Sequence, residues 1–208
     1  ENEIQPGQVI CSNCRRPYPE EGAPYRCPVC TGVYDLPVLA PFDPDAVQPA
    51  EPGLWRYRFS LGLPASAPVV TLGEGNTPLV WDQLFERQVA LKLEFANPTG
   101  SYKDRGSAVL VSFLLSRGVR EAVEDSSGNA GASFAAYAAR AGMLGRVFVP
   151  DYAAGPKRAQ IEAYGAEVVR ILGTRSQTAE ACLRAVEAGA VYASHAYLPQ
   201  GLAGYATL

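Results

Sequence analysis

The chain has 208 residues, of which 48% are hydrophobic and 19% are charged, and its formal net charge is −3. This composition permits one large folded domain or two modest ones, and the slightly acidic balance excludes the basic surface that nucleic-acid binding requires. The longest apolar run, residues 108–115, is far shorter than the ~20 residues that span a bilayer. The first residues lack the pattern of a secretory signal, so we expect a cytoplasmic protein without a nucleic-acid or membrane partner.

Four cysteines open the chain in the pattern C-x2-C-x12-C-x2-C. They are Cys11, Cys14, Cys27 and Cys30. Two thiolates from one tight turn can reach the same ion, and the second pair completes a tetrahedron, so the spacing predicts a structural zinc site. A module that has lost its metal, or a pair of redox-active dithiols, is the alternative. The fifth cysteine, Cys182, lies in a predicted amphipathic helix and is expected to be a small buried apolar residue.

A proline-rich connector follows the cysteines. Its prolines are spaced too closely for a helix or a central strand; they are Pro37, Pro41, Pro44, Pro49 and Pro52. Residues 55–59 then alternate aromatic and basic side chains, which predicts either a short strand or a segment that packs on the next domain.

From residue 89 onward the pattern alternates between strands and helices. Residues 89–95 alternate with period two and predict a half-buried strand. Ser101 is a plausible N-cap for a helix that ends near Arg117, with Gly118 as its stop. Further strands are predicted at 121–124, 146–149, 167–171 and 190–192, and helices at 129–141, 156–164 and 177–188. Strands separated by helices predict an α/β fold with βαβ crossovers and a parallel sheet.

Lys103 lies in the first turn of one predicted helix, just after the turn-forming residues 97–100. Ligands of parallel sheets bind at such strand-to-helix junctions. The positive end of the helix dipole favours a neutral amine, which is the form that condenses with an aldehyde. A surface lysine paired with Asp104 would explain the spacing equally well.

A second strand-to-helix junction, residues 125–131, is rich in serine and glycine. Small residues allow backbone N–H groups at a helix N-terminus to point at an anion. An ordinary helix cap is the alternative for this loop.

Three segments taken together resemble the threonine synthase family of fold-type II pyridoxal-phosphate enzymes, in order and spacing. They read Glu-Gly-Asn-Thr-Pro-Leu at 74–79, Asn-Pro-Thr-Gly-Ser-Tyr-Lys-Asp-Arg-Gly at 97–106 and Ser-Ser-Gly-Asn-Ala-Gly at 126–131. The four-cysteine ribbon is similar to the N-terminal extension of many bacterial and archaeal members. The resemblance implies a ribbon at 1–36, a connector and first part of the large domain at 37–100, a small α/β domain at 101–195, and a return to the large domain at 196–208.

The resemblance also implies roles for individual residues. Lys103 matches the lysine that binds pyridoxal phosphate as a Schiff base and shuttles protons, and Asn129 matches the asparagine that hydrogen-bonds the 3′-hydroxyl of the ring. The substrate carboxylate would be held by Ser126, Ser127, Gly128, Asn129 and Ala130, and Thr77 would line the substrate side. The family's glycine-rich phosphate loop and ring-nitrogen partner come later than Leu208, so we expect a fragment that binds the cofactor poorly alone.

The implied reaction converts O-phospho-L-homoserine and water to L-threonine and phosphate, in an enzyme that is commonly a homodimer. Another fold-type II lyase, similar to threonine dehydratase or cysteate synthase, is an alternative; Leu198 favours it, because the family more often has asparagine there. A zinc-ribbon interaction protein with an inactive enzyme-like half is a further alternative. His195, the only histidine, is expected to be structural and to lie near a strand end, with contact to the substrate phosphate as the alternative.

Overall fold

A four-stranded parallel sheet forms the centre of the fold. The computed structural model describes residues 4–153 and 155–208, and the sheet has the order β7-β6-β5-β8. All three pairings are parallel, which confirms the predicted α/β class. Its strands are β5 (Glu121–Glu124), β6 (Leu144–Pro150), β7 (Glu167–Ile171) and β8 (Val191–Tyr192).

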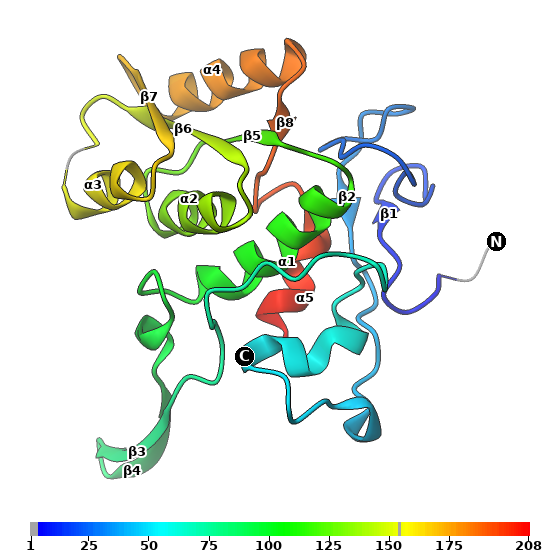
Figure 1. Ribbon diagram of the computed structural model, residues 1–208, viewed down its shortest axis with the longest axis vertical. Helices are drawn as coiled ribbons and strands as arrows, with labels where there is room; N and C mark the ends of the chain where they lie inside the picture. Colours follow the sequence, from blue (N-terminus) through cyan, green and yellow to red (C-terminus); the bar gives the residue numbers. More distant parts are fainter. Residues whose placement is uncertain (1–3, 154) are drawn as a thin grey trace.

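Helices cover both faces of this sheet (Figure 1). The helices α2 (Asn129–Arg140) and α3 (Pro156–Ala163) lie on one face, and α4 (Arg175–Glu187) lies on the other. The chain runs outward from β5 to β6 and β7, and then returns through α4 to β8 on the opposite side of β5. Ligands of open parallel sheets bind at the carboxyl ends of strands that flank such a reversal.

The helix α1 (Lys103–Ser116) packs along α2 and is buried over most of its length. On its other side lie η4 (Pro199–Gly201) and α5 (Leu202–Tyr205). Two glycines permit this close approach. A Cβ atom on Gly106 would lie 2.3 Å from the Tyr205 ring, and one on Gly204 would lie 2.1 Å from the carbonyl oxygen of Arg105.

The four-cysteine ribbon, with the short strands β1 (Ile10–Cys11) and β2 (Tyr34–Asp35), packs directly against the α/β unit. Tyr25 contacts the rings of Tyr192 and Tyr197, with centroids 5.4 and 5.5 Å away.

The connector contains two 3-10 helices, η1 (Pro44–Ala46) and η2 (Gly53–Ser60). Residues 55–59 lie within η2, so the predicted strand is wrong. Trp55 is only 2% exposed, which confirms the alternative that this segment packs on its neighbour.

The strand predicted at 89–95 is present in part as β4 (Arg87–Lys92), but its predicted half-burial is wrong. Among the described residues, β4 pairs only with β3 (Leu79–Leu84), in an antiparallel hairpin that extends away from the sheet (Figure 1), and η3 (Glu94–Ala96) follows it. Alternating apolar residues become half-buried only where another layer covers them, and Trp81 in this hairpin is 62% exposed. Within the described residues, no helix has the length and apolar character needed to cross a membrane.

Candidate active site and four-cysteine centre

Lys103 is the first residue of α1, in the helix turn that the sequence predicts. Its Nζ atom lies 4.9 Å from the centroid of the Tyr102 ring and 5.3 Å from that of Tyr205. Lys92 Nζ donates to the carbonyl oxygen of Thr77 at 2.8 Å, and Lys157 Nζ donates to the side chain of Gln160 at 3.0 Å. Across residues 4–153 and 155–208, by contrast, Lys103 Nζ has no hydrogen-bond acceptor and no carboxylate partner. Its amine is therefore available for a ligand.

Asp104 does not pair with Lys103, so the interpretation of Lys103 as a surface ion pair is wrong. The Asp104 side chain is fully buried and turns inward. It accepts hydrogen bonds from the amide and the hydroxyl of Thr99 and from Ser133 Oγ, and burial raises the pKa of its carboxyl. Because Ser133 belongs to α2, this carboxyl joins the N-terminal turns of α1 and α2.

Arg105 makes a second set of contacts that hold residues 97–106, called the lysine loop below. Its Nε donates to Glu94 Oε2 at 2.8 Å, and its Nη2 donates to Thr77 Oγ1 at 3.1 Å. The hydroxyl of Thr77 in turn donates to Glu94 Oε1 at 2.5 Å. Burial acts to raise the pKa of Glu94, but hydrogen bonds from Arg105, Thr77 and Asn97 outweigh it and lower this pKa to about 2. Thr77 thus lies inside a buried ionic network that holds Lys103 in place.

Ser101 does not cap the helix, contrary to the prediction. The N-cap position is Tyr102, which makes no side-chain capping bond, because the helix begins one residue later than Ser101 would require. The Ser101 hydroxyl is instead buried without a partner among the described residues. Buried polar atoms rarely remain unpaired. An unpaired hydroxyl two residues from an available amine fits a polar, aldehyde-bearing cofactor such as pyridoxal phosphate.

Residues 125–131, called the serine loop below, leave backbone N–H donors open at the N-terminus of α2. The first hydrogen bond of this helix runs from the Ala132 amide to the Gly128 carbonyl at 3.1 Å. Gly128 is the N-cap and provides no side-chain cap, so the loop does not act as an ordinary side-chain cap. Asn129 begins the helix and is exposed. The free amides at the positive end of the helix dipole suit a carboxylate or a phosphate.

Gly131 keeps this loop closed, and its replacement by alanine is expected to open it. A Cβ atom there would lie 1.8 Å from the carbonyl oxygen of Ser126, so the loop must move. We expect Gly131→Ala to lower the free energy of unfolding by about 1–3 kcal/mol, the usual effect of overpacking. Thermal unfolding measures this loss. The control is Ala139→Ser on the exposed end of the same helix. An unchanged melting temperature for Gly131→Ala would contradict the close packing of the loop.

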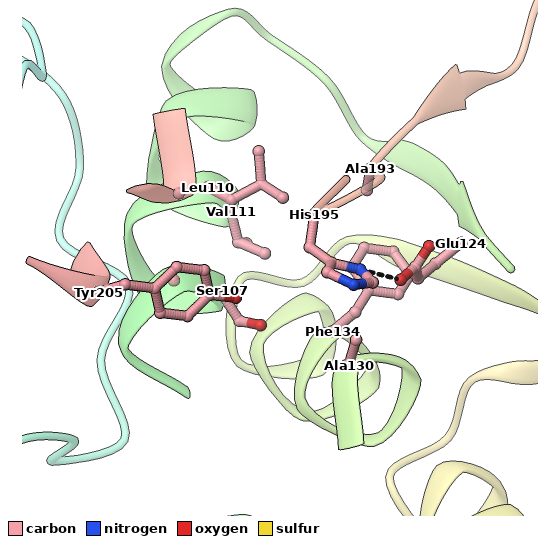
Figure 2. A pocket seen from close by; sticks show the side chains of 11 residues that line it. Ser107, Leu110, Val111, Glu124, Ala130, Phe134, Ala193, His195 and Tyr205 are labelled. Atoms are coloured by element: carbon pink, nitrogen blue, oxygen red, sulfur yellow. Dashed lines mark hydrogen bonds and ion pairs between the residues drawn. The ribbon is translucent and has the colours of Figure 1, made fainter. Parts of the chain in front are cut away.

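A second polar pair lies near the loop, and the sequence analysis did not identify it. His195 Nδ1 lies 3.0 Å from Oε1 of Glu124, a carboxylate that is 1% exposed and whose pKa is raised by burial. Both line a cavity of about 10 Å³, which is room for about one water molecule, and Figure 2 shows Tyr205 on its other side. The sequence signal that could have revealed this pair is Glu124, an acidic residue that ends an apolar strand directly before the serine loop.

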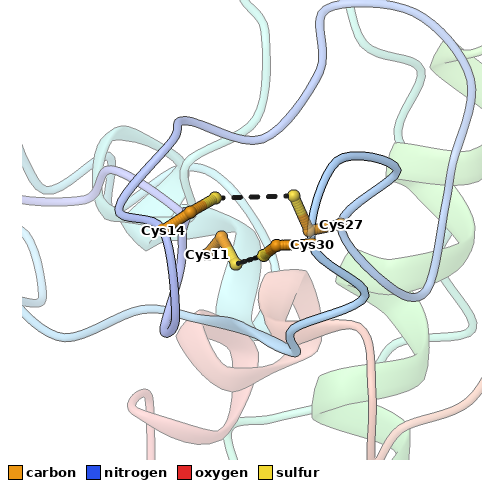
Figure 3. Close-up of side chains that lie close together, drawn as sticks. All are labelled: Cys11, Cys14, Cys27 and Cys30. Carbon is orange, nitrogen blue, oxygen red and sulfur yellow. Dashed lines mark hydrogen bonds between the residues drawn. The ribbon is translucent and has the colours of Figure 1, made fainter.

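The four cysteines meet as their spacing predicts (Figure 3). All four Sγ atoms lie within 4.8 Å of one another. Cys11 and Cys30 are 3.4 Å apart, and Cys14 and Cys27 are 3.7 Å apart. Tetrahedral zinc with Zn–S bonds of ~2.3 Å requires sulfurs roughly 3.8 Å apart, so the cluster fits this ion.

The surroundings of the cluster also suit a metal. A hydrogen bond from the Gly32 backbone, the largest of several contributions, lowers the pKa of Cys30 to about 6, which favours the thiolate that binds metal. The Arg16 backbone acts to lower the pKa of Cys14, but burial and the neighbouring thiols outweigh it and raise this pKa to about 11. Cys182 is fully buried, as expected, and burial raises its pKa to about 12.

Comparison with known proteins agrees with this geometry. Residues 70–208 match the family described as "Pyridoxal-phosphate dependent enzyme". Threonine synthase from Methanocaldococcus jannaschii is 32% identical over 209 residues, covering 95% of this chain and 51% of that protein. Threonine synthase from Synechocystis sp. is 40% identical over 131 residues, covering 57% and 34%. The chain therefore spans between a third and about half of the length of these relatives.

Solved structures extend the likeness to the fold. A pyridoxal 5′-phosphate-dependent aspartate racemase has a TM-score of 0.57 at 32% identity, covering 62% of this chain and 42% of that one. A hydrogen sulfide-producing enzyme from Fusobacterium nucleatum has a TM-score of 0.53 at 27% identity, covering 58% and 42%. The chain thus belongs to the pyridoxal-phosphate dependent enzyme family and has its fold-type II α/β architecture.

Proposed function

We propose that the chain is part of an enzyme that converts O-phospho-L-homoserine and water to L-threonine and phosphate. The observation that carries this proposal is the available amine of Lys103 beside the open N-terminus of α2. Asp104 and Ser133 join the two helix ends. The threonine synthase of Methanocaldococcus jannaschii matches 95% of the chain, and the family match over residues 70–208 includes this region.

Each residue has a defined part in the proposed reaction. Pyridoxal phosphate, when bound, supplies an electron sink for charge that develops at the substrate α-carbon. Lys103 holds the cofactor covalently and moves the proton at that carbon. The loop formed by Ser126, Ser127, Gly128, Asn129 and Ala130 binds the substrate carboxylate through its amides and hydroxyls, and Asn129 also donates to the ring hydroxyl. Thr77 supports the substrate side through Arg105 and Glu94.

We also propose that Cys11, Cys14, Cys27 and Cys30 hold one structural zinc ion. All four positions of the tetrahedron are then filled by protein, and none remains for a reacting water. Cys14→Ser is expected to abolish stoichiometric zinc binding, whereas Cys182→Ala, outside the cluster, leaves one zinc per chain. Metal released by acid and quantified by a colorimetric chelator measures both. Purified wild-type chain that binds no zinc under reducing conditions would contradict this assignment.

The proposed organisation follows the expected boundaries, with a ribbon at 1–36, connector and large-domain residues at 37–100, a small domain at 101–195 and large-domain residues again at 196–208. The intact enzyme is proposed to be a cytoplasmic homodimer that acts on a small amino-acid substrate.

The decisive assay compares phosphate release from O-phospho-L-homoserine with ammonia release from L-threonine, using the intact cofactor-loaded protein. We expect phosphate together with L-threonine, and no ammonia. Ammonia without phosphate would replace the proposal with a dehydratase-like reaction. Phosphate released only from O-phospho-L-serine would indicate a cysteate-synthase-like reaction. These comparisons are informative because Leu198, where the family more often has asparagine, is 1% exposed and offers no polar side chain.

A further inference from the structure

Glu124 and His195 lie at the carboxyl ends of β5 and β8, the two neighbouring strands between which the strand order reverses. Glu124 is the last residue of β5, and His195 follows β8. One Glu124 oxygen lies 3.0 Å from His195 Nδ1, and the other accepts the Asp125 amide at 2.7 Å. Among the described residues, His195 is the only side chain that hydrogen-bonds this buried carboxylate. A buried carboxylate with a single imidazole partner is costly to maintain for packing alone.

The pairing determines which ring nitrogen can act. Because Nδ1 is held by Glu124, Nε2 is left for another group, and a carboxylate in this position fixes the orientation and tautomer of the imidazole. The His195 side chain is 35% exposed, whereas that of Glu124 is 1% exposed. In Figure 2 the ring lies beside Ala130 of the serine loop and across the cavity from Tyr205.

Tyr205 connects this cavity with the lysine loop. It lines the cavity together with His195, and its ring centroid lies 5.3 Å from Lys103 Nζ. Ser107, one turn after Lys103 in α1, lines the same cavity. The cavity at the carboxyl edge of the sheet is therefore bordered by His195, by Ala130 of the serine loop and by the Tyr205 ring, which also contacts Lys103.

The other ionisable groups around His195 already have partners. Asp125, directly after β5, accepts from Arg175 and from the Tyr192 hydroxyl, each at 2.7 Å. Asp104 of α1 is held by Thr99 and Ser133. Burial, together with neighbouring acidic groups, raises the pKa of Tyr205 in α5, so its phenol stays neutral. The rest of the cavity wall is apolar, with Leu110, Val111 and Phe134.

We propose that His195, positioned by Glu124, is a second proton-transfer residue, which acts on the leaving oxygen of the substrate while Lys103 acts on its carbon atoms. This inference rests on the proposed function. The carbon–oxygen bond breaks, its electron pair stays on the oxygen of the departing phosphate, and that oxygen takes the proton from His195 Nε2. Lys103 removes a proton from carbon in the elimination and returns one when water adds. The added water gives its hydroxyl to carbon and its other proton to Nε2, so the sum is substrate plus water to product plus phosphate.

The first test is the pH profile of phosphate release by the intact, cofactor-loaded enzyme. His195→Gln keeps a hydrogen-bond donor but cannot titrate, and we expect kcat to fall by ~10²–10⁴-fold, the usual contribution of a general acid–base group. The limb of the pH profile that reports the protonated His195 should disappear in this variant. Glu124→Gln should shift that limb and lower kcat less than His195→Gln does. Glu180→Gln, an exposed carboxylate on α4, is the matched control.

The second test follows the protonation of the His195 imidazole by NMR. In the intact protein labelled at histidine nitrogen, the pair of NMR signals that is absent from His195→Gln belongs to His195 and reports its protonation and tautomer. In cofactor-loaded wild type we expect the signals to move when O-phospho-L-homoserine is added, and to move much less with L-homoserine. Glu124→Gln should change the tautomer and the titration midpoint of free His195, which a purely structural change elsewhere would not do.

The two tests separate the two proposals. If wild type releases phosphate and His195→Gln keeps both limbs of the profile with an unchanged kcat, the role of His195 is overturned while the proposed function stands. If wild type releases phosphate but the His195 signals do not respond to O-phospho-L-homoserine, the role of His195 is likewise overturned while the proposed function stands. If wild type releases no phosphate, the proposed function fails, and the role of His195 on the leaving oxygen is overturned with it.

Discussion

Replacing Lys103 with alanine is expected to abolish covalent attachment of pyridoxal phosphate and to lower turnover by at least ~10²-fold, because both the anchoring amine and the proton-transfer group are lost. The amine of Lys103 has no competing partner among the described residues and sits between two tyrosine rings. Borohydride reduction of the loaded intact protein, followed by peptide mass spectrometry, should place the cofactor on the peptide that contains Lys103 in wild type only.

Lys157→Ala is the matched control, because Lys157 lies nearby and donates to Gln160 and to the Thr99 carbonyl. Its variant should retain the covalent link. A cofactor found on Lys157 or Lys92 after reduction would refute the assignment of Lys103.

Replacing Arg105 with alanine is expected to cost about 3–5 kcal/mol of unfolding free energy, the usual loss when one partner of a buried ion pair is removed. The guanidinium is 2% exposed and its partner Glu94 is 17% exposed. The Arg105 guanidinium also donates to the carbonyl and the hydroxyl of Thr207 at 3.0 Å, so its removal takes a donor from several acceptors that are at least partly buried. Denaturant unfolding measures this loss. Arg158→Ala, which removes the 3.7 Å pair with the exposed Glu162 and a 3.4 Å hydrogen bond to the Ala153 carbonyl, should change stability by less than about 1 kcal/mol.

The dependence of the unfolding free energy on pH gives a second measure of the Arg105–Glu94 ion pair. Hydrogen bonds from Arg105, Thr77 and Asn97 lower the pKa of Glu94 from its usual 4.5 to about 2 in the folded chain. A lowered folded-state pKa stabilises the fold above the unfolded pKa, and this stabilisation is lost as the pH falls from about 4.5 toward 2. Arg105→Ala should flatten the stability curve in that window. An equally steep curve in the variant would show that other carboxylates cause the acid sensitivity.

The sequence predicted the parallel sheet and its helices because each signal there is local. Apolar strands of four to seven residues alternate with helices that end at Gly118, Gly142 and Gly165, all of which have positive φ. The cysteine cluster was predictable for the same reason, since two short turns determine where all four sulfurs lie.

The errors arose where a contact depends on distant residues. The alternation at 89–95 is real, but burial requires a second layer, and the hairpin is exposed within the described part of the chain. Ser101 has the chemistry of an N-cap, yet the buried bonds of Asp104 and Arg105 start the helix later. Glu124 and His195 are 71 residues apart, and only the return of β8 beside β5 brings them together.

The edge-to-face contacts of Tyr25 with Tyr192 and Tyr197 join the ribbon to the sheet, and we expect the two to unfold as one cooperative unit. The Tyr192 ring lies 5.4 Å from Tyr25, and its hydroxyl donates to Asp125 at the start of the serine loop. Elements that share buried contacts tend to open together. Amide hydrogen exchange should therefore quicken in β5 and β8, and not only around the four cysteines, when the ribbon is unfolded. We therefore expect unfolding of the ribbon to loosen residues 125–131, the loop that we propose binds the substrate carboxylate.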